Sequence, residues 1–372
     1  MLHRIVLPFI MSLRFKSIME YSNLIQIFSF AAMMASSIFI PLLAESFGAT
    51  PAVVGLLVGA YNLTFLLSSY FFGLLSDKYG GKHILRIGLL FAAFFFCLQV
   101  FAHDLFSLFV VRSLAGACAG IFPAALAVYA YKEQHGKMGK FTGSGSLGWS
   151  VGAMGAGLIF NNQIIFAVSA MAFFMAFFFS LRLAKIEHVP HKINVFPRRF
   201  FLKNARIYIP YFFRALGAQA VWAIFPLYLV FTGADKLWVG IAYFVNTFTQ
   251  YFIMRYVERF RNLYLVNIGL LLSIATFIGY ALFPYLPIVL LLQLLLAFSF
   301  STLLVGTVQE LLEVNLEQST AIGLLNSITN FTAVISPFAA GFIAQFYGYS
   351  GVMWMAAFFT FIGLISFTTV LE

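Results

Sequence analysis

Residues 70–88 read YFFGLLSDKYGGKHILRIG, and residues 251–269, in the second half of the chain, read YFIMRYVERFRNLYLVNIG. The two segments align without a gap, so that Asp77 corresponds to Glu258. A slightly larger separation relates three earlier pairs, namely Pro41 and Pro226, Gly48 and Gly233, and Gly55 and Gly240. Both separations are close to half of the 372 residues, so the sequence predicts two copies of one structural unit.

The composition excludes a soluble globular protein. Hydrophobic residues make up 62% of the chain and charged residues 9%, against about 45–50% and about 25% in ordinary soluble domains. Apolar runs of about 20 residues, the length that crosses a bilayer as a helix, recur from end to end. Cys97 and Cys118 both lie inside such runs, so the sequence offers no disulfide framework and no thiolate metal cluster.

Twelve apolar runs are candidate membrane spans. They cover residues 22–44, 52–75, 84–102, 105–129, 141–160, 164–183, 207–230, 239–254, 263–283, 288–312, 321–342 and 352–371. Because the loops are short, neighbouring spans must run antiparallel. The spans must be helices, because the hydrocarbon core of a bilayer does not tolerate an open sheet edge. We therefore predict an all-α membrane protein with twelve transmembrane helices in two pseudo-symmetric six-helix halves. The expected parts are an N-terminal segment 1–20, a first half 21–183, a linker 184–206 and a second half 207–372.

The basic residues predict the orientation. If the first span starts in the cytoplasm, nineteen of the 22 Lys and Arg residues lie inside and Lys236 alone lies outside. This asymmetry follows the positive-inside rule and places both termini on the cytoplasmic side of the plasma membrane. The net charge of +10 is then an orientation signal and not a mark of nucleic-acid binding. Residues 1–20 read as a cytoplasmic segment lying on the inner leaflet, as a frayed tail, or as the product of a misassigned start.

A loop motif after the second span carries a family resemblance. Its members are Gly73, Asp77, Lys78, Gly80 and Lys82. They match the Gly-x-x-x-Asp-Arg/Lys-x-Gly-Arg/Lys-Arg/Lys signature, except that Gly81 stands where a basic residue is usual. The chain thus resembles the major facilitator superfamily of secondary transporters. In the second half, Glu258 and Arg259 stand at the positions of Asp77 and Lys78. The resemblance implies alternating access between two halves, with substrate bound near the midplane.

The motif also predicts an inner gate. Asp77 at the cytoplasmic end of the second span can attract the exposed N–H groups at the start of the eleventh span, or it can merely cap a turn. The loop before the eleventh span is acidic, with Glu310, Glu313 and Glu317. This acidic loop either pairs with Lys82, Arg86 or the central linker, or is a solvated face.

Two arginines lie inside spans, where a charge costs several kcal/mol and marks a functional candidate. Arg112 shares one helical stripe with Gly116 and Gly120, which resembles the fourth-helix signature of proton-coupled drug exporters. The alternative is an arginine that backbone carbonyls hold for helix packing alone. Asp104, two turns away, is the carboxylate nearest to it in sequence and hence a coupling candidate. Arg214 is either an anion contact or a side chain that snorkels to the headgroups.

Uncharged polar residues on the spans are further candidates for substrate contacts or for holding helices together. They are Asn62, Gln99, Gln219, Asn246, Gln250, Gln293, Asn326 and Asn330. Residues 143–148, GSGSLG, fit a dinucleotide-binding fingerprint, but no strand precedes them and no acidic residue follows at the required distance. We interpret this segment as helix packing.

These features predict a secondary active transporter, most simply a proton-coupled exporter of small amphipathic organic compounds. The alternatives are a facilitator or symporter for a small organic anion, and a membrane sensor or scaffold that does not transport. No His-Glu-x-x-His motif, paired intramembrane aspartates or Ser/His pair occurs on the spans, so an enzyme is not expected. We expect no catalytic residue, metal or cofactor. The expected partners are a small-molecule substrate, protons and membrane lipids, with no nucleic acid, and the chain is expected to be a monomer.

The predicted orientation can be tested by labelling. In a background without Cys97 and Cys118, a single cysteine at Ser350 should react with an impermeant thiol reagent added to intact cells, because it lies outside. A cysteine at Asn194 should react only after permeabilisation, because the basic linker lies inside. Labelling at Asn194 in intact cells contradicts the orientation.

Overall fold

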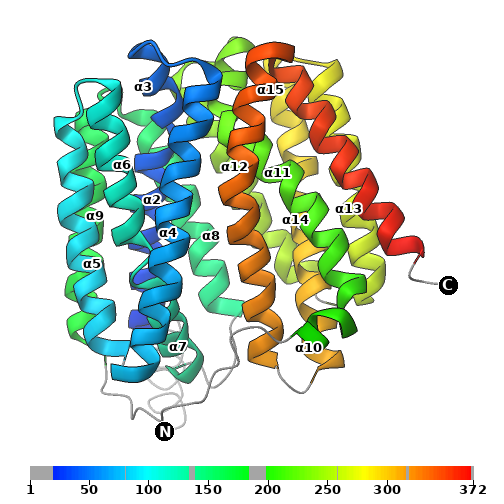
Figure 1. Cartoon of the computed structure of the whole chain (residues 1–372), viewed down its shortest axis with the longest axis horizontal. Helices are drawn as coiled ribbons and strands as arrows, with labels where there is room; N and C mark the ends of the chain where they lie inside the picture. The colour runs from blue at the N-terminus through cyan, green and yellow to red at the C-terminus, as the bar shows by residue number, and fades with distance from the viewer. Residues whose placement is uncertain are drawn as a thin grey trace, which may run out of the picture.

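The computed structural model describes residues 20–79, 81–133, 139–183, 198–257, 259–315 and 318–369. These residues are helical almost throughout (Figure 1). The helices are α2 (Tyr21–Ile38), α3 (Ile40–Ser46), α4 (Pro51–Tyr79), α5 (Gly81–Leu98), η1 (Gln99–Phe101), α6 (Leu105–Ala119), α7 (Pro123–Glu133), α8 (Gly139–Leu158), α9 (Asn162–Leu181), α10 (Arg198–Lys203), α11 (Ala205–Phe231), α12 (Lys236–Val257), α13 (Asn262–Leu282), α14 (Leu286–Val314) and α15 (Gln318–Thr369).

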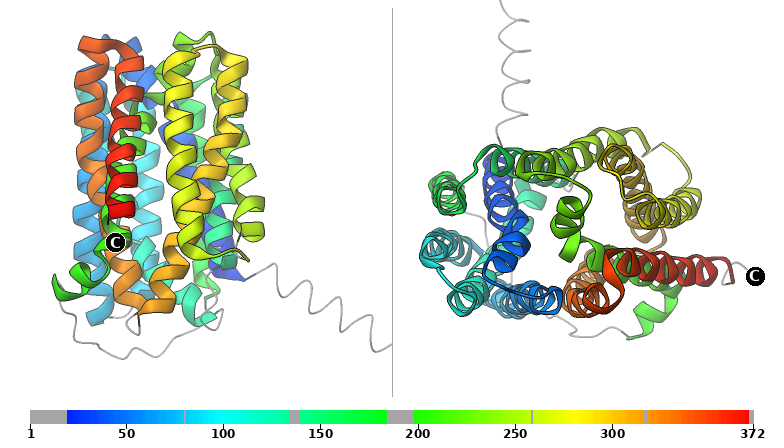
Figure 2. Two further views of the ribbon diagram at one scale, coloured as in Figure 1. Left: turned by 90° about the vertical axis from the view of Figure 1, so that its right-hand side faces the viewer. Right: turned by 90° about the horizontal axis from the view of Figure 1, so that it is seen from above.

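These helices make twelve passes along the bundle, as predicted. The first pass is α2 and α3, which meet at a break at Phe39, and the fourth is α6 and α7. α15 contains the last two passes, because Gly348 interrupts it with a φ of 71° that only glycine adopts readily. Seen from above, the first half of the chain lies on one side of the bundle and the second half on the other (Figure 2).

Nine stretches of the described residues are long and apolar enough to cross a membrane, and that of α15 includes both of its passes. α8 and α12 are not among them. α8 is rich in glycine and serine, and α12 carries Asn246 and Gln250. Both helices can be more polar because they pack on each other and are thereby partly shielded from lipid.

The internal repeat is present in the backbone. Gly48 and Gly233, which the sequence pairs, follow α3 and α11 and have φ values of 83° and 95°. The alignment of Asp77 with Glu258 also pairs Gly88 with Gly269. Gly88 packs against Phe122 N, and Gly269 packs in the same way against Leu303 N. The sequence-derived pairing of the two halves therefore holds for turns and for helix contacts.

Glycines join the two halves at the end of the bundle that carries α3. A Cβ on Gly55 of α4 would lie 3.0 Å from Gly341 Cα of α15, and a Cβ on Gly157 of α8 would lie 3.0 Å from Gly240 Cα of α12. α4 and α15 run side by side in Figure 1. Since no side chain fits at either crossing, the backbones of the two halves are in direct contact there.

Glycines also set the packing inside the first half. A Cβ on Gly148 would lie 2.6 Å from Ile27 O, and one on Gly152 would lie equally close to the backbone of Ala31, so α8 packs tightly on α2. This confirms the helix-packing interpretation of residues 143–148. Gly116 and Gly120 likewise let α6 approach the backbone of α4.

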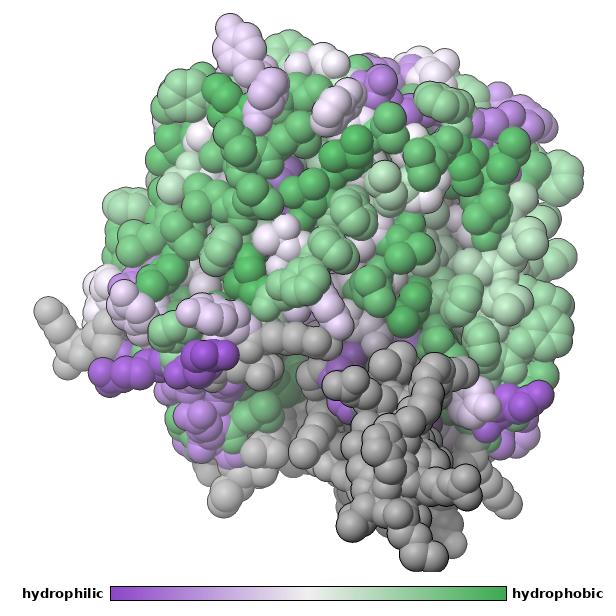
Figure 3. Space-filling view, turned by 180° about the vertical axis from the view of Figure 1, so that it is seen from behind, coloured by the Kyte–Doolittle hydropathy of each residue, from purple (hydrophilic) through white to green (hydrophobic). Residues whose placement is uncertain are grey.

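The surface fits a bilayer. Figure 3 shows hydrophobic side chains over most of the visible face, with hydrophilic groups gathered toward the two ends. Large side chains such as Phe106 and Met171 are strongly exposed. These features are those of a multi-pass integral membrane protein.

The glycine crossings predict a local sensitivity. Gly157→Val should lower the thermal unfolding midpoint of the purified protein, because overpacking a close contact costs about 1–3 kcal/mol. Gly155→Val, on the same helix, is the matched control, because a Cβ there meets nothing within 4 Å. Equal midpoints for the two variants would show that the α8–α12 contact does not need glycine.

Candidate functional site

Arg112 lies in a network of neutral groups inside the first half. Its side chain is 4% exposed. Nη1 donates to Ser36 Oγ and to Gln99 Oε1, both at 3.1 Å, and Nη2 donates to Ser37 Oγ at 3.1 Å. The guanidinium carbon is 4.1 Å from the centre of the Tyr61 ring. No carboxylate among the described residues contacts this buried charge.

The helix ends place these partners. Ser36 and Ser37 lie in the last turn of α2, just before the break at Phe39, and Gln99 begins the tight turn η1 after α5. Ser36 Oγ also donates to Gln99 Oε1 at 3.1 Å. Gln99 Oε1 is therefore filled by two donors. Ser36, Ser37 and Tyr61 were not predicted, because their sequence positions give no sign that they meet Arg112.

Asp104 is not brought to Arg112. It is fully exposed and caps α6, where Oδ1 accepts the Ser107 backbone N–H at 2.7 Å. This hydrogen bond lowers the pKa of the Asp104 carboxyl below its ordinary value, with a smaller contribution from the Ser107 side chain. The capping geometry turns the carboxylate toward its own helix start and away from the arginine.

Arg214 lies inside the second half and does not snorkel to the surface. Its side chain is 4% exposed, and Nε donates to Ser273 Oγ of α13 at 3.1 Å. Ser273 Oγ in turn shares a hydrogen bond with Ser299 Oγ of α14, and the Phe300 ring centre is 5.3 Å from the guanidinium carbon. Nη1 and Nη2 have no hydrogen-bond partner among the described residues. Both atoms retain some accessible surface, because neither is among the fully buried unpartnered atoms.

Three of the predicted amide side chains are unpartnered among the described residues, one of them on the same helix as Arg214. Asn62 of α4, Gln219 of α11 and Asn330 of α15 are half-buried and have no hydrogen-bond partner within the described part of the chain. Tyr211, one turn from Arg214, bonds Thr329 next to Asn330 at 3.2 Å. Asn326 is exposed. α11 and α15 thus present several unfilled donors and acceptors.

Three further predicted amides, Asn246, Gln250 and Gln293, form a second cluster. Asn246 donates to Gln293 O at 3.1 Å, and Gln250 donates to Asn246 Oδ1 at 2.6 Å. The Gln293 amide is fully buried and both of its polar atoms are unpartnered.

The repeat relates this cluster to the Arg112 network. The alignment that pairs Asp77 with Glu258 also pairs Arg112 with Gln293. The alignment that pairs Gly48 with Gly233 also pairs Tyr61 with Asn246, and it pairs Ser29 with Arg214. Each half therefore carries one arginine at a position that the other half fills with a neutral residue.

The loop motif is described only in part. Gly80, Glu258 and Glu317 lie outside the described residues, as do the side chains of Asp77 and Lys78. Gly73 faces Ala124, and Arg259 lies over the Tyr256 ring at 4.7 Å.

The basic residues after the motif are bound elsewhere than expected. Lys82 donates to Leu183 O at 2.8 Å, and Arg86 donates to Ser180 O and Leu181 O. The C-terminal carbonyls of α9 attract these cations, as helix ends do. Glu310 and Glu313 accept hydrogen bonds from Asn262 at 3.3 Å and 2.8 Å. Among the described residues, Glu310 and Glu313 therefore do not pair with Lys82 or Arg86, and Glu317 lies outside that part of the chain.

Comparisons with known proteins find a matching family and two relatives of similar sequence. Residues 23–316 match the family model described as Major Facilitator Superfamily. The staphylopine export protein of Staphylococcus aureus is 26% identical over 276 residues, which are 67% of this chain and 69% of that protein. The multidrug resistance protein MdtG of Proteus mirabilis is 30% identical over 188 residues, 46% of this chain and 47% of its own length.

Solved structures agree on the fold. A bacterial homologue of the human lysosomal transporter Spinster, inward-facing and occupied, superposes with a TM-score of 0.76 at 13% identity over 94% of this chain and 95% of that one. The human organic anion transporter MFSD10 gives a TM-score of 0.75 at 15% identity over 95% and 99% of the two chains.

Proposed function

The chain belongs to the major facilitator superfamily and is a transporter, not an enzyme, and on that premise we propose that it exports small amphipathic organic compounds that carry a negative charge. Alternating access of the two halves moves the compound. The names of two relatives, an export protein and a multidrug resistance protein, support export.

The proposal that the substrate is negatively charged rests on the surroundings of Arg214. Its guanidinium is buried beside two serines, and its Nη groups are left without a partner among the described residues. A buried cation with unfilled donors is stabilised by an anionic ligand, and guanidinium binds carboxylates and phosphates through two parallel hydrogen bonds. Arg112 differs, because each of its Nη groups already donates to a side-chain oxygen and only its Nε has no partner among the described residues.

Uncharged groups complete the proposed substrate contacts. Gln219 lies further along α11 than Arg214, Asn330 lies on α15, and Asn62 lies across on α4. Half-buried amides without partners can bind the polar atoms of a ligand while the aromatic side chains around them accept its apolar part.

We infer the orientation from the basic residues of the loops and the gate from the loop motif. We place both termini and the linker 184–206 in the cytoplasm and the protein in the plasma membrane, as a monomer. Residues 1–20 remain a proposed cytoplasmic segment. Asp77, with Lys78, Gly80 and Lys82, is proposed to latch the inner ends of the halves.

We propose proton coupling as the driving force, because the stripe of Arg112, Gly116 and Gly120 resembles the fourth-helix signature of proton-coupled exporters. No Asp, Glu or His lies in the middle third of any predicted span, and Asp104 serves as a helix cap. An arginine cannot take this role itself, because a guanidinium stays protonated in proteins.

Flux measurements in proteoliposomes test the proposed substrate class. A panel of amphipathic carboxylates should be transported in preference to the matched neutral amides. Arg214→Gln should raise KM for the carboxylates by roughly tenfold or more, as expected for a lost charge-assisted hydrogen bond, and leave the amides unchanged. Arg86→Gln is the control, since that arginine already donates to Ser180 O and Leu181 O at the end of α9. Amides carried as well as carboxylates contradict the anion proposal, and flux indifferent to a pH gradient contradicts proton coupling.

The latch has its own test. Asp77→Asn should shift the protein toward inward-open states, because it removes the charge that attracts the exposed N–H groups of the opposite half. Labelling of a cysteine introduced at Asn330 should then become faster. Glu258→Gln, at the corresponding position of the second copy, should have a smaller effect. Equal rates for both variants and the parent protein would show that neither carboxylate latches the halves.

A further inference from the structure

One lysine of the second half contacts the first half at the end of the bundle that carries α3. Lys236 is the first residue of α12. Its Nζ donates to Phe160 O at 2.9 Å and to Asn162 Oδ1 at 3.0 Å, where α8 is joined to α9. Nζ also lies 5.5 Å from the centre of the Phe39 ring, at the break between α2 and α3. A single side chain therefore contacts three groups of the opposite half.

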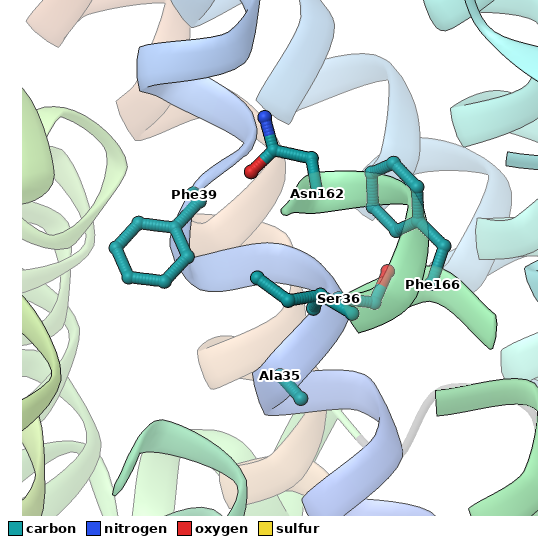
Figure 4. A pocket seen from close by; sticks show the side chains of 6 residues that line it. Ala35, Ser36, Phe39, Asn162 and Phe166 are labelled. Carbon is teal, nitrogen blue, oxygen red and sulfur yellow. The ribbon is translucent and has the colours of Figure 1, made fainter. Parts of the chain in front are cut away.

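The first half holds the partners of Lys236 in place. Asn161 Oδ1 caps α9 by accepting two backbone N–H groups of that helix, so the Asn162 side chain is not needed as a cap. An ammonium group has no acceptor function, so Asn162 must present its oxygen to it. Figure 4 shows Asn162 and Phe39 together at the narrow gap between α2 and α9.

Nothing within α12 itself explains a lysine at this position. The dipole of a helix disfavours a cation in its first turn. The neighbouring carboxylate, Asp235, caps α12 by accepting the Trp238 backbone N–H at 2.9 Å. No carboxylate among the described residues forms an ion pair with Lys236. The ammonium group is therefore held by the first half.

The two crossings between the halves differ in their polar contacts. At the crossing of α8 and α12, Lys236 bonds the first half, and further along the same helices Ser150 and Thr247 share a hydrogen bond of 2.9 Å. Between α4 and α15 no hydrogen bond forms among the described residues. The repeat places Pro51 of α4 at the position of Lys236. The contact made by a charged group is thus specific to one crossing.

We propose that Lys236 is a clasp that holds the halves together at the α3 end and releases when that end opens. The proposal rests on the alternating access of the proposed function and not on the charge of the transported compound. Hydrogen bonds from a charged donor are stronger than those between neutral groups, so the two bonds of Nζ favour the closed arrangement. Because both acceptors are neutral, release leaves no carboxylate without its partner, and water hydrates the ammonium group.

Distances between spin labels at this end test the clasp. In a background without Cys97 and Cys118, labels at Ser46 of α3 and at Tyr285 before α14, both exposed, report the separation of the halves in the purified full-length protein. Lys236→Met keeps most of the side-chain length and removes the charge. The ratio of long to short distances should rise by roughly tenfold or more, the change expected when a hydrogen bond from a charged group is lost.

Asn162→Ala is the second variant, and it leaves the cap at Asn161 intact. It should raise the same ratio in the parent protein and add nothing in Lys236→Met, because both substitutions remove one contact. Lys203→Met is the matched control. Lys203 Nζ also bonds a backbone oxygen and an asparagine oxygen, but at the end of α14, at the opposite end of the bundle (Figure 1). Its ratio should equal that of the parent protein.

Three results overturn the proposal. They are an unchanged ratio in Lys236→Met, independent effects of Lys236→Met and Asn162→Ala, and an equal rise in Lys203→Met. The distances are measured without any transported compound, so a missing preference for carboxylates in the flux panel leaves this result standing.

Discussion

The structure depends on direct backbone contact between its two halves at one end of the bundle. Gly55 meets Gly341 and Gly157 meets Gly240, and each pair joins a helix of the first half to a helix of the second. In hydrocarbon the hydrophobic effect does not drive helices together, so close van der Waals packing must do so. Small residues at both crossings supply that packing at the end of the bundle that carries α3. This arrangement suits the rocking of two rigid halves that alternating access requires.

Duplication of one unit explains the shape of the protein but not its chemistry. Helix starts, turn glycines and helix contacts recur at matching positions of the two halves, because they are set by backbone geometry. The polar positions inside the halves have diverged. Arg112 corresponds to Gln293, and Arg214 corresponds to Ser29, whose hydroxyl bonds its own helix at Ile25 O. The repeat thus keeps two similar frames and places one buried cation in each, at different heights.

The sequence was sufficient for the twelve passes, because apolar length, short loops and the repeat all depend on local order along the chain. It also identified both intramembrane arginines, because charge in a span is rare. It could not identify their partners. Ser36, Ser37 and Ser273 are small polar residues of an ordinary kind, and only the crossing of helices brings them to a guanidinium. The expected approach of Asp104 to Arg112 was wrong for a local reason: a residue at an N-cap bonds its own helix.

The two arginines also show how a buried charge can be kept without a permanent partner of opposite sign. A fixed carboxylate would neutralise Arg214 and leave it nothing to offer a ligand, whereas serine oxygens hold the guanidinium in place and leave its charge available. Neutral oxygens also hold Arg112, whose Nη groups donate to Ser36, Ser37 and Gln99. Each half therefore holds its buried cation with neutral side-chain oxygens, and no carboxylate among the described residues contacts either guanidinium.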